Sequence, residues 1–63
     1  MSRLRFYRLK AGLTQEQVAK ELDVDTSAIS NWERGKNLPL KKYRLKLRAL
    51  YHATEEELFG EGE

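Results

Sequence analysis

Signals that start and stop helices follow one another closely along this chain, and they leave room only for short helices. Ser, Thr and Asp often cap helix N-termini, and glycine often ends a helix. Thr14 with Gln17, and Thr54 with Glu57, have the spacing of a capping box, in which two residues bond each other's backbone N–H. With Ser2, Asp25 and Pro39 as starts and Gly12, Gly35 and Gly60 as stops, they predict helices over residues 3–11, 15–22, 26–34, 39–51 and 55–59.

No segment has the pattern of a β-strand, because β-branched residues are scattered and apolar and polar residues do not alternate. We therefore expect an all-α fold of five helices in one domain, residues 1–60, followed by a frayed acidic tail at 61–63. A chain of 63 residues buries a modest core, so its stability depends on well-packed helices or on a partner.

Apolar residues recur at helical spacing and predict which side of each helix faces the core. The predicted stripes are Leu4, Tyr7 and Ala11 with Arg8 at their edge, then Val18, Ala19 and Leu22, then Ala28, Ile29 and Trp32, and finally Leu40, Tyr43, Leu47, Leu50 and Tyr51. The opposite face of the third helix carries Thr26, Ser27, Ser30, Asn31 and Arg34. Short polar residues are mediocre helix formers because they compete for backbone hydrogen bonds. Their presence indicates that this face meets a ligand.

The absence of cysteine and the presence of a single histidine, His52, exclude several classes of site. They rule out a disulfide framework, a thiolate or histidine-based metal site and a cysteine nucleophile. A nucleophile beside a base, a glycine-rich phosphate loop and a carboxylate cluster are also missing, so we expect no enzyme, metal or cofactor. No apolar run reaches the length of a membrane span, and the basic N-terminus lacks the apolar stretch of a secretory signal. These features predict a cytoplasmic protein without a membrane partner.

The charges are segregated although the net charge is only +2. Basic residues open the chain, and the stretch between Glu33 and Glu55 holds basic residues and no acid. Such segregation favours a positive face that meets a polyanion such as nucleic acid. On charge alone, a solvated basic helix face is the other interpretation.

A tight turn at Asp23 separates the second and third predicted helices. Leu22 and Val24 can anchor the chain to the core on either side of it, and the small Ala19 lets the third helix cross closely. Helix, short turn and helix with a small polar outer face is the geometry of a helix-turn-helix. The second helix of that motif enters the major groove, about 12 Å wide, where short side chains permit close approach to the bases.

The segment GLTQEQVAKELDVDTSAISNWERGK, residues 12–36, closely resembles the lambda-repressor-like, Cro-type helix-turn-helix family. The matching positions are Gly12-Leu13-Thr14-Gln15, Val18-Ala19, Leu22, Val24, Ile29-Ser30, Trp32-Glu33 and Gly35-Lys36, with weaker matches at Pro39, Leu47 and Leu58. The resemblance implies a compact five-helix DNA-binding domain whose helix-turn-helix is formed by the second and third helices. Asp23 and His52 stand where the family often has glycine, and both residue types tolerate the left-handed conformation.

The resemblance also implies roles for individual residues. Thr26, Ser27 and Asn31 match positions that read base edges, and the amide of Asn31 can bond two edge atoms of adenine. Arg8 and Glu33 resemble an ion pair that joins the first helix to the third. The expected contacts to the DNA backbone, which include basic residues beyond the matched positions, are Gln15, Ser30, Arg34, Lys36, Asn37, Lys41 and Lys42.

Contacts to other protein chains are expected at two places. Leu38 and Leu40, around the start of the fourth helix, are candidate contacts of a homodimer. A two-fold dimer on a near-palindromic operator is expected because one such domain offers only a small interface. Phe6 and Leu9 face away from the stripe of the first helix, where they are either partly covered by neighbouring side chains or form a patch for a partner.

We therefore expect a small transcriptional regulator that binds double-stranded DNA and represses by occluding a promoter. We expect no effector domain, because the sequence stops at the fifth helix. The alternative is a protein-interaction module on the same fold, such as an antitoxin or a coactivator-like adaptor, with little DNA specificity.

Overall fold

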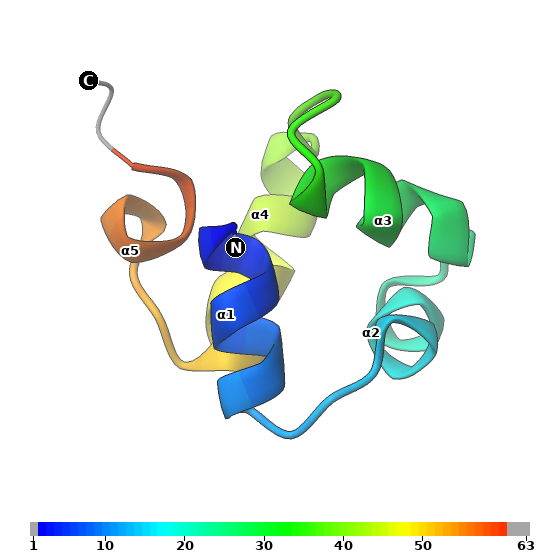
Figure 1. Ribbon diagram of the computed structural model, residues 1–63, viewed down its shortest axis with the longest axis horizontal. Helices are drawn as coiled ribbons and strands as arrows, with labels where there is room; N and C mark the ends of the chain where they lie inside the picture. Colours follow the sequence, from blue (N-terminus) through cyan, green and yellow to red (C-terminus); the bar gives the residue numbers. More distant parts are fainter. Residues whose placement is uncertain (1, 61–63) are drawn as a thin grey trace.

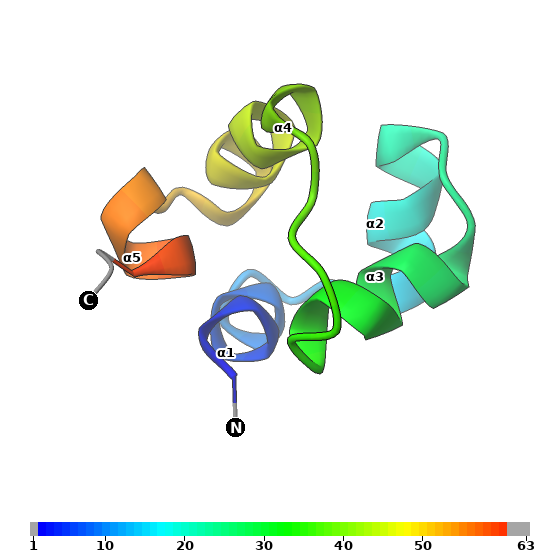
Figure 2. The same cartoon turned by 90° about the horizontal axis from the view of Figure 1, so that it is seen from above.

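The computed structural model describes residues 2–60, and the tail predicted at 61–63 lies outside them. Over residues 2–60 the chain forms no strand and five helices, which are α1 (Arg3–Lys10), α2 (Gln15–Leu22), α3 (Thr26–Glu33), α4 (Lys41–Tyr51) and α5 (Glu55–Phe59). The expected all-α fold is confirmed. In Figure 1, α1 lies between α5 on one side and the α2–α3 pair on the other. Figure 2 shows α4 opposite α1, so that the five helices surround one core.

Side chains cap four of these five helices, as the sequence predicts. The acceptors are Ser2 for α1, Thr14 for α2, Asp25 for α3 and Thr54 for α5, with O···N distances of 3.0–3.1 Å. The reciprocal bond of each capping box is also present, at 2.8 Å to Gln17 and 2.9 Å to Glu57. The positions of these helices therefore follow from local chemistry.

The fourth helix begins later than predicted. It starts at Lys41, and Leu40 is its N-cap residue, whose apolar side chain cannot cap. Pro39 is buried, and its carbonyl oxygen accepts a hydrogen bond from Arg44 Nη1 at 3.2 Å. The proline therefore anchors the preceding loop instead of opening the helix. Leu40 was expected in the core stripe, but its extended backbone takes its side chain out of helical register and leaves it 66% exposed.

The core is built from residues of all five helices described. It contains Leu4, Val18, Ala19, Leu22, Ile29, Leu47, Tyr51 and Leu58, with Trp32, Tyr43 and Leu50 partly buried against it. The predicted stripe of α1 was wrong at its end, because Ala11 lies beyond the last helical turn and is exposed. Arg8, placed at the edge of that stripe, is buried instead. Within residues 2–60, no helix has the length and apolar character needed to cross a membrane.

Residues in the left-handed conformation close α2 and α4, as predicted. Asp23 has φ = 59° and His52 has φ = 52°. In both cases the next N–H bonds back into the last turn, from Val24 to Ala19 O at 3.0 Å and from Ala53 to Arg48 O at 3.2 Å. This pattern satisfies carbonyl groups that the helix leaves unpaired and turns the chain sharply.

Replacing His52 with glycine is expected to stabilise the fold by up to about 1 kcal/mol. Glycine relieves the steric cost of the left-handed conformation, which outweighs the extra entropy it gives the unfolded chain. Urea unfolding followed by circular dichroism measures the change. Gly12→Ala is the matched control, because Gly12 has φ = 77° and open space where the alanine methyl would lie, so the variant should lose stability through backbone strain alone. A loss of stability in His52→Gly would contradict the expectation.

Candidate nucleic-acid interface

The turn between α2 and α3 sets α3 steeply across α2. Figure 1 views α2 almost end-on and α3 from the side. Ala19 of α2 and Ile29 of α3 are 3% and 1% exposed, so the two helices meet through a small residue and a branched apolar one. With Asp23 reversing the chain between them, α3 is presented as a ridge whose inner face is fixed.

A buried ion pair fixes the C-terminal end of α3. Arg8 Nε donates to Glu33 Oε2 at 2.6 Å, and Arg8 Nη2 donates to Glu33 Oε1 at 3.2 Å. Arg8 Nη1 donates to the carbonyl oxygen of Leu13 at 2.9 Å. The side-chain hydrogen bond to Glu33 raises the pKa of Arg8, against the opposing effect of burial. The pair expected from the sequence therefore joins α1, the loop before α2 and the last residue of α3.

Gln15 belongs to the same network. Its Nε2 donates to Glu33 Oε1 at 3.0 Å, and its side chain is half-buried. The sequence predicts a contact from Gln15 to the DNA backbone but not this bond to Glu33, which depends on how the helices pack. The backbone N–H of Gln15 lies in the first turn of α2, where N–H groups have no partner within the helix. A DNA phosphate at this point could accept hydrogen bonds from these backbone N–H groups while the Gln15 side chain stays bonded to Glu33.

The outer face of α3 carries the residues expected to read bases. Thr26 and Ser27 are exposed, Ser30 and Asn31 are half-buried, and Arg34 follows as the exposed C-cap residue. Ser27, Asn31 and Arg34 lie on the side opposite Ile29, and Ser30 lies on the flank between the two sides. The sequence expectation was wrong for Thr26, which is three residues from Ile29 and therefore lies on the same side, at the exposed N-terminal end of the helix. Of the predicted base-reading residues, Ser27 and Asn31 therefore share one surface, and Thr26 lies at the N-terminal end of the helix.

Asp25 restricts what Ser27 can offer to a ligand. The hydroxyl of Ser27 donates to Asp25 Oδ2, and the backbone N–H of Ser27 donates to the same oxygen at 3.1 Å. These bonds, the hydroxyl first, lower the pKa of Asp25 from its ordinary value of 3.8. The cap therefore holds at neutral pH and weakens only as the pH falls through that lowered pKa. With its proton directed to Asp25, Ser27 presents lone pairs outward.

Asn31 and Arg34 are also joined. Arg34 Nη2 donates to Asn31 Oδ1 at 3.0 Å. Both residues are candidate contacts from the sequence, but their bond to each other is not foreseen there. Their spacing of three residues on one helix face is the signal that could have revealed it.

Basic side chains continue from the end of α3. Lys36 and Asn37 are exposed in the loop that follows Gly35, and Lys41 and Lys42 are exposed in the first turn of α4. These are the residues expected at the DNA backbone. Their exposure leaves them accessible to a phosphate.

An aromatic pair links the start of α4 to α3. The ring of Tyr43 lies 5.6 Å from that of Trp32, measured between centroids. Lys42 Nζ lies 5.0 Å from the centroid of the Tyr43 ring. The Lys42 ammonium therefore lies beside the Trp32–Tyr43 pair, close to α3.

Two other basic residues of α4, Arg44 and Arg48, are directed toward α5. Arg44 Nε lies 3.2 Å from Glu55 Oε2 without the alignment of a hydrogen bond, and Arg48 Nη1 lies 3.9 Å from Glu55 Oε1. The Arg44 guanidinium also lies 5.9 Å from the centroid of the Phe59 ring. Part of the basic stretch seen in the sequence is therefore paired with an acid and is not available to a polyanion in the same way as Lys36, Lys41 and Lys42.

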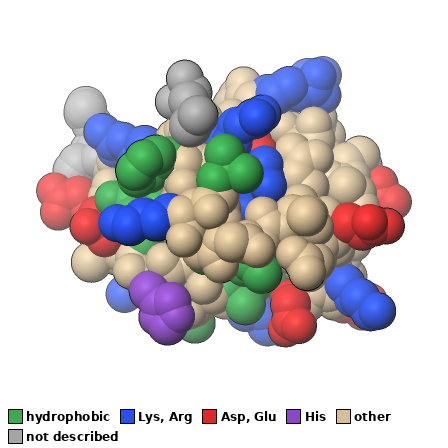
Figure 3. Space-filling model, turned by 60° about the horizontal axis from the view of Figure 1, so that its bottom comes forward, with side chains coloured by type: hydrophobic (Ala, Val, Ile, Leu, Met, Phe, Trp, Pro, Cys, Tyr) green, Lys and Arg blue, Asp and Glu red, His purple; other side chains and the backbone are tan. Residues whose placement is uncertain are grey.

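Large apolar side chains are exposed at several separate places. They are Phe6 at 50%, Leu9 at 47%, Leu38 at 69%, Leu40 at 66% and Leu45 at 49%. On the face drawn in Figure 3, apolar side chains form separate patches among charged and polar ones. Leu45 was not expected from the sequence, although its position on the side of α4 opposite Leu47 could have indicated its exposure.

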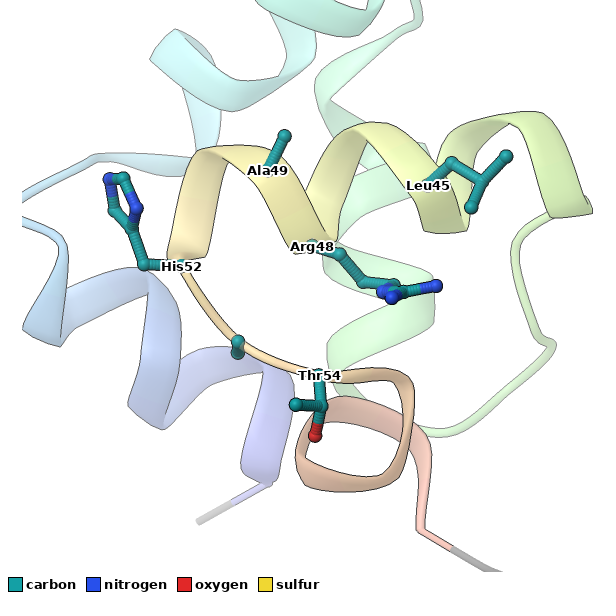
Figure 4. A pocket seen from close by; sticks show the side chains of 6 residues that line it. Leu45, Arg48, Ala49, His52 and Thr54 are labelled. Carbon is teal, nitrogen blue, oxygen red and sulfur yellow. The ribbon is translucent and has the colours of Figure 1, made fainter.

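A shallow hollow lies between the outer side of α4 and the loop leading to α5 (Figure 4). Its lining includes Leu45, Arg48, His52 and Thr54. In Figure 4 the side chains of His52, Arg48 and Thr54 point in different directions, so they do not converge on a common point. Among residues 2–60, no group of three His, Cys, Asp or Glu side chains could hold a metal ion. Of the surfaces described, the outer face of α3 and the basic residues after it form the best-defined candidate site.

A model of the family described as Helix-turn-helix matches residues 4–58 of this chain. The match covers α2, α3 and α4 in full and nearly all of α1 and α5. The family therefore corresponds to the folded unit and not to a short motif alone.

Similar proteins come from a bacterium and from archaea. The HTH-type transcriptional regulator ImmR of Bacillus subtilis is 38% identical over 61 residues, which is 97% of this chain and 48% of that protein. An uncharacterized HTH-type transcriptional regulator of Archaeoglobus fulgidus is 36% identical over 92% of this chain and 83% of its own. The uncharacterized HTH-type transcriptional regulator MJ0272 of Methanocaldococcus jannaschii is 34% identical over 92% and 88%. The chain thus spans about half of ImmR and most of the two archaeal proteins. No solved structure matches this chain significantly.

Proposed function

Because this chain belongs to the helix-turn-helix family, we propose that it binds double-stranded DNA sequence-specifically and regulates transcription. One observation carries the proposal. The outer face of α3 gathers short polar side chains, while Ile29 and Glu33 on the same helix fix its inner side. A helix held in this way can enter the major groove without rearranging the fold.

In this proposal, Thr26, Ser27 and Asn31 meet base edges. The phosphates on either side are met by Gln15 at the start of α2, by Ser30, and by the exposed residues Lys36, Asn37, Lys41 and Lys42. Phosphate contacts supply most of the affinity and fix the register, whereas base contacts supply the sequence preference. The two groups of residues therefore have separable effects.

A homodimer on a near-palindromic operator completes the proposal. Leu38 and Leu40 are the most exposed of the large apolar residues described, at 69% and 66%. They lie close to the basic residues that follow α3, so a two-fold contact there would leave those residues of both copies free to meet one duplex. Dimers of this kind bind half-sites about one helical turn apart. A dimer bound over a promoter would act as a repressor. Since its target is genomic DNA, the proposal includes an intracellular location.

Asn31→Ala is expected to relax base preference at one position and to cost about 1–3 kcal/mol on the preferred site. Lys36→Ala should weaken binding to all DNA nearly equally, because a phosphate contact does not depend on sequence. In vitro selection from random duplexes gives the preferred site, and fluorescence anisotropy over a salt series gives its affinity and that of scrambled DNA. A palindromic site would also give the spacing of the two half-sites. If the two variants behaved alike on preferred and scrambled DNA, the assignment of α3 as the reading helix would be wrong.

The exposure of Phe6 and Leu9 supports a second candidate, a protein-interaction module such as an antitoxin or a coactivator-like adaptor. The same binding measurements separate the two candidates. Weak binding that is uniform across sequences and disappears as salt rises would leave only the electrostatic contribution. That outcome would favour a protein partner at the Phe6 and Leu9 surface.

A further inference from the structure

We propose that Arg34 reads a guanine in the major groove and that Asn31 positions its guanidinium for this contact. The inference rests on the proposed DNA-binding function and deepens it. It revises two expectations drawn from the sequence, which assign Arg34 to a phosphate and Asn31 to an adenine. The observation that carries it is the hydrogen bond from Arg34 Nη2 to Asn31 Oδ1 at 3.0 Å.

The direction of the Arg34 side chain is the first step. Arg34 is the C-cap residue of α3, with φ = −87° and ψ = −1°. Helical side chains lean toward the N-terminus of their helix, and the bond to Asn31 shows that Arg34 does so. The guanidinium therefore lies about one helical turn back from its own Cα. It therefore lies closer to the N-terminal half of α3, the half from which recognition helices contact base edges.

The charge of Arg34 is not paired with an acid among residues 2–60. Within residues 2–60 it forms no salt bridge, and its neighbour Glu33 is taken by Arg8 and Gln15. A guanidinium has five N–H donors in a planar fork, and only one of them goes to Asn31. Arg34 is exposed, so the remaining donors are available to a ligand.

The bond to Arg34 changes the hydrogen-bonding groups that Asn31 presents to a base. Reading adenine with two bonds needs its amide oxygen to accept from N6 and its amide nitrogen to donate to N7. Here the oxygen accepts from Arg34 and keeps one lone pair, whereas the amide of Asn31 and the remaining N–H groups of Arg34 together offer several donors, so the surface consists mainly of donors. The base edge that fits such a surface best carries acceptors only. In the major groove that edge is the N7 and O6 of guanine, because adenine places an amino group beside its N7.

The test begins with in vitro selection on random duplexes using the wild-type protein, Arg34→Ala and Asn31→Ala. The selected wild-type site should contain a guanine whose replacement weakens binding by roughly 5- to 100-fold. Arg34→Ala should lose the preference at that base pair, and Asn31→Ala should reduce it at the same base pair. Lys36→Ala is the matched control, since it removes an exposed charge from the adjacent loop and should keep the preference.

Replacing that guanine with 7-deazaguanine then removes one acceptor while leaving base pairing intact. The wild-type protein should lose several-fold in affinity, whereas Arg34→Ala should lose almost nothing more. Equal losses in both proteins would overturn the inference. Selection of an adenine at the base pair that Asn31→Ala affects would also overturn it. The same holds if Arg34→Ala weakens binding equally on the selected site and on scrambled DNA, because Arg34 would then contact a phosphate. If the wild-type protein selected no sequence at all, the proposed function itself would fail and this inference with it.

Discussion

Replacing Glu33 with alanine is expected to cost about 3–5 kcal/mol of stability, the penalty for breaking a buried ion pair by removing one partner. Arg8 would keep a buried charge without its acceptor, and Gln15 would lose its partner at 3.0 Å. A domain of 63 residues has about 3–9 kcal/mol in total, so this loss would remove roughly a third or more of the stability and should lower the unfolding temperature strongly. Thermal unfolding followed by circular dichroism at neutral pH measures the loss.

Two further variants separate this explanation from a general effect of removing a carboxylate. Glu55→Ala removes a partly exposed acid near Arg44 and Arg48, and should cost less than about 1 kcal/mol. The double variant Arg8→Met with Glu33→Leu removes both charges and should recover much of the stability lost by Glu33→Ala. A Glu33→Ala protein as stable as Glu55→Ala would show that the pair does not hold α3.

Ile29→Ala is expected to cost about 2–5 kcal/mol, since it removes a fully buried side chain and leaves a cavity beneath α3. The side chain is 1% exposed and belongs to the core cluster. Urea unfolding gives the loss directly. The protein should be partly rescued by its selected DNA duplex, because a ligand that binds only the folded state stabilises that state.

The control for Ile29 is Leu38→Ala, which shortens an apolar side chain that is 69% exposed. Surface changes of this kind usually alter stability by no more than about 0.5 kcal/mol. Similar losses in the two variants would mean that α3 is not held by its inner face. The physical basis for a rigidly presented α3 would then be lost.

The extent of the helices could be predicted because their signals are local. A capping box such as Thr14 with Gln17 involves residues three apart, and its geometry does not depend on the rest of the fold. The start of α4 could not be predicted in this way. Pro39 is compatible with a first helical turn, but burial and its bond to Arg44 hold it in the loop. These contacts exist only after the helices have packed.

The candidate site shows the same division. Periodicity alone puts Ser27 and Asn31 on one face of α3 and Ile29 on the other. The bonds that decide what those side chains offer, from Ser27 to Asp25 and from Arg34 to Asn31, depend on side-chain rotamers that a sequence does not specify. The sequence therefore predicts the surface, but the assignment of Asn31 to adenine takes no account of the hydrogen bond that its amide oxygen accepts from Arg34.

The two-sided character of α3 has an evolutionary consequence. Ile29 and Glu33 hold the helix to the rest of the molecule, while Thr26 and Ser27 are exposed and are not part of the core cluster. Substitutions on the exposed side are therefore nearly free of folding constraints, and selection can act on them for a new target sequence without first compensating a loss of stability. Duplicated copies of such a gene could diverge in specificity through a few changes on one helix, each intermediate remaining a folded protein.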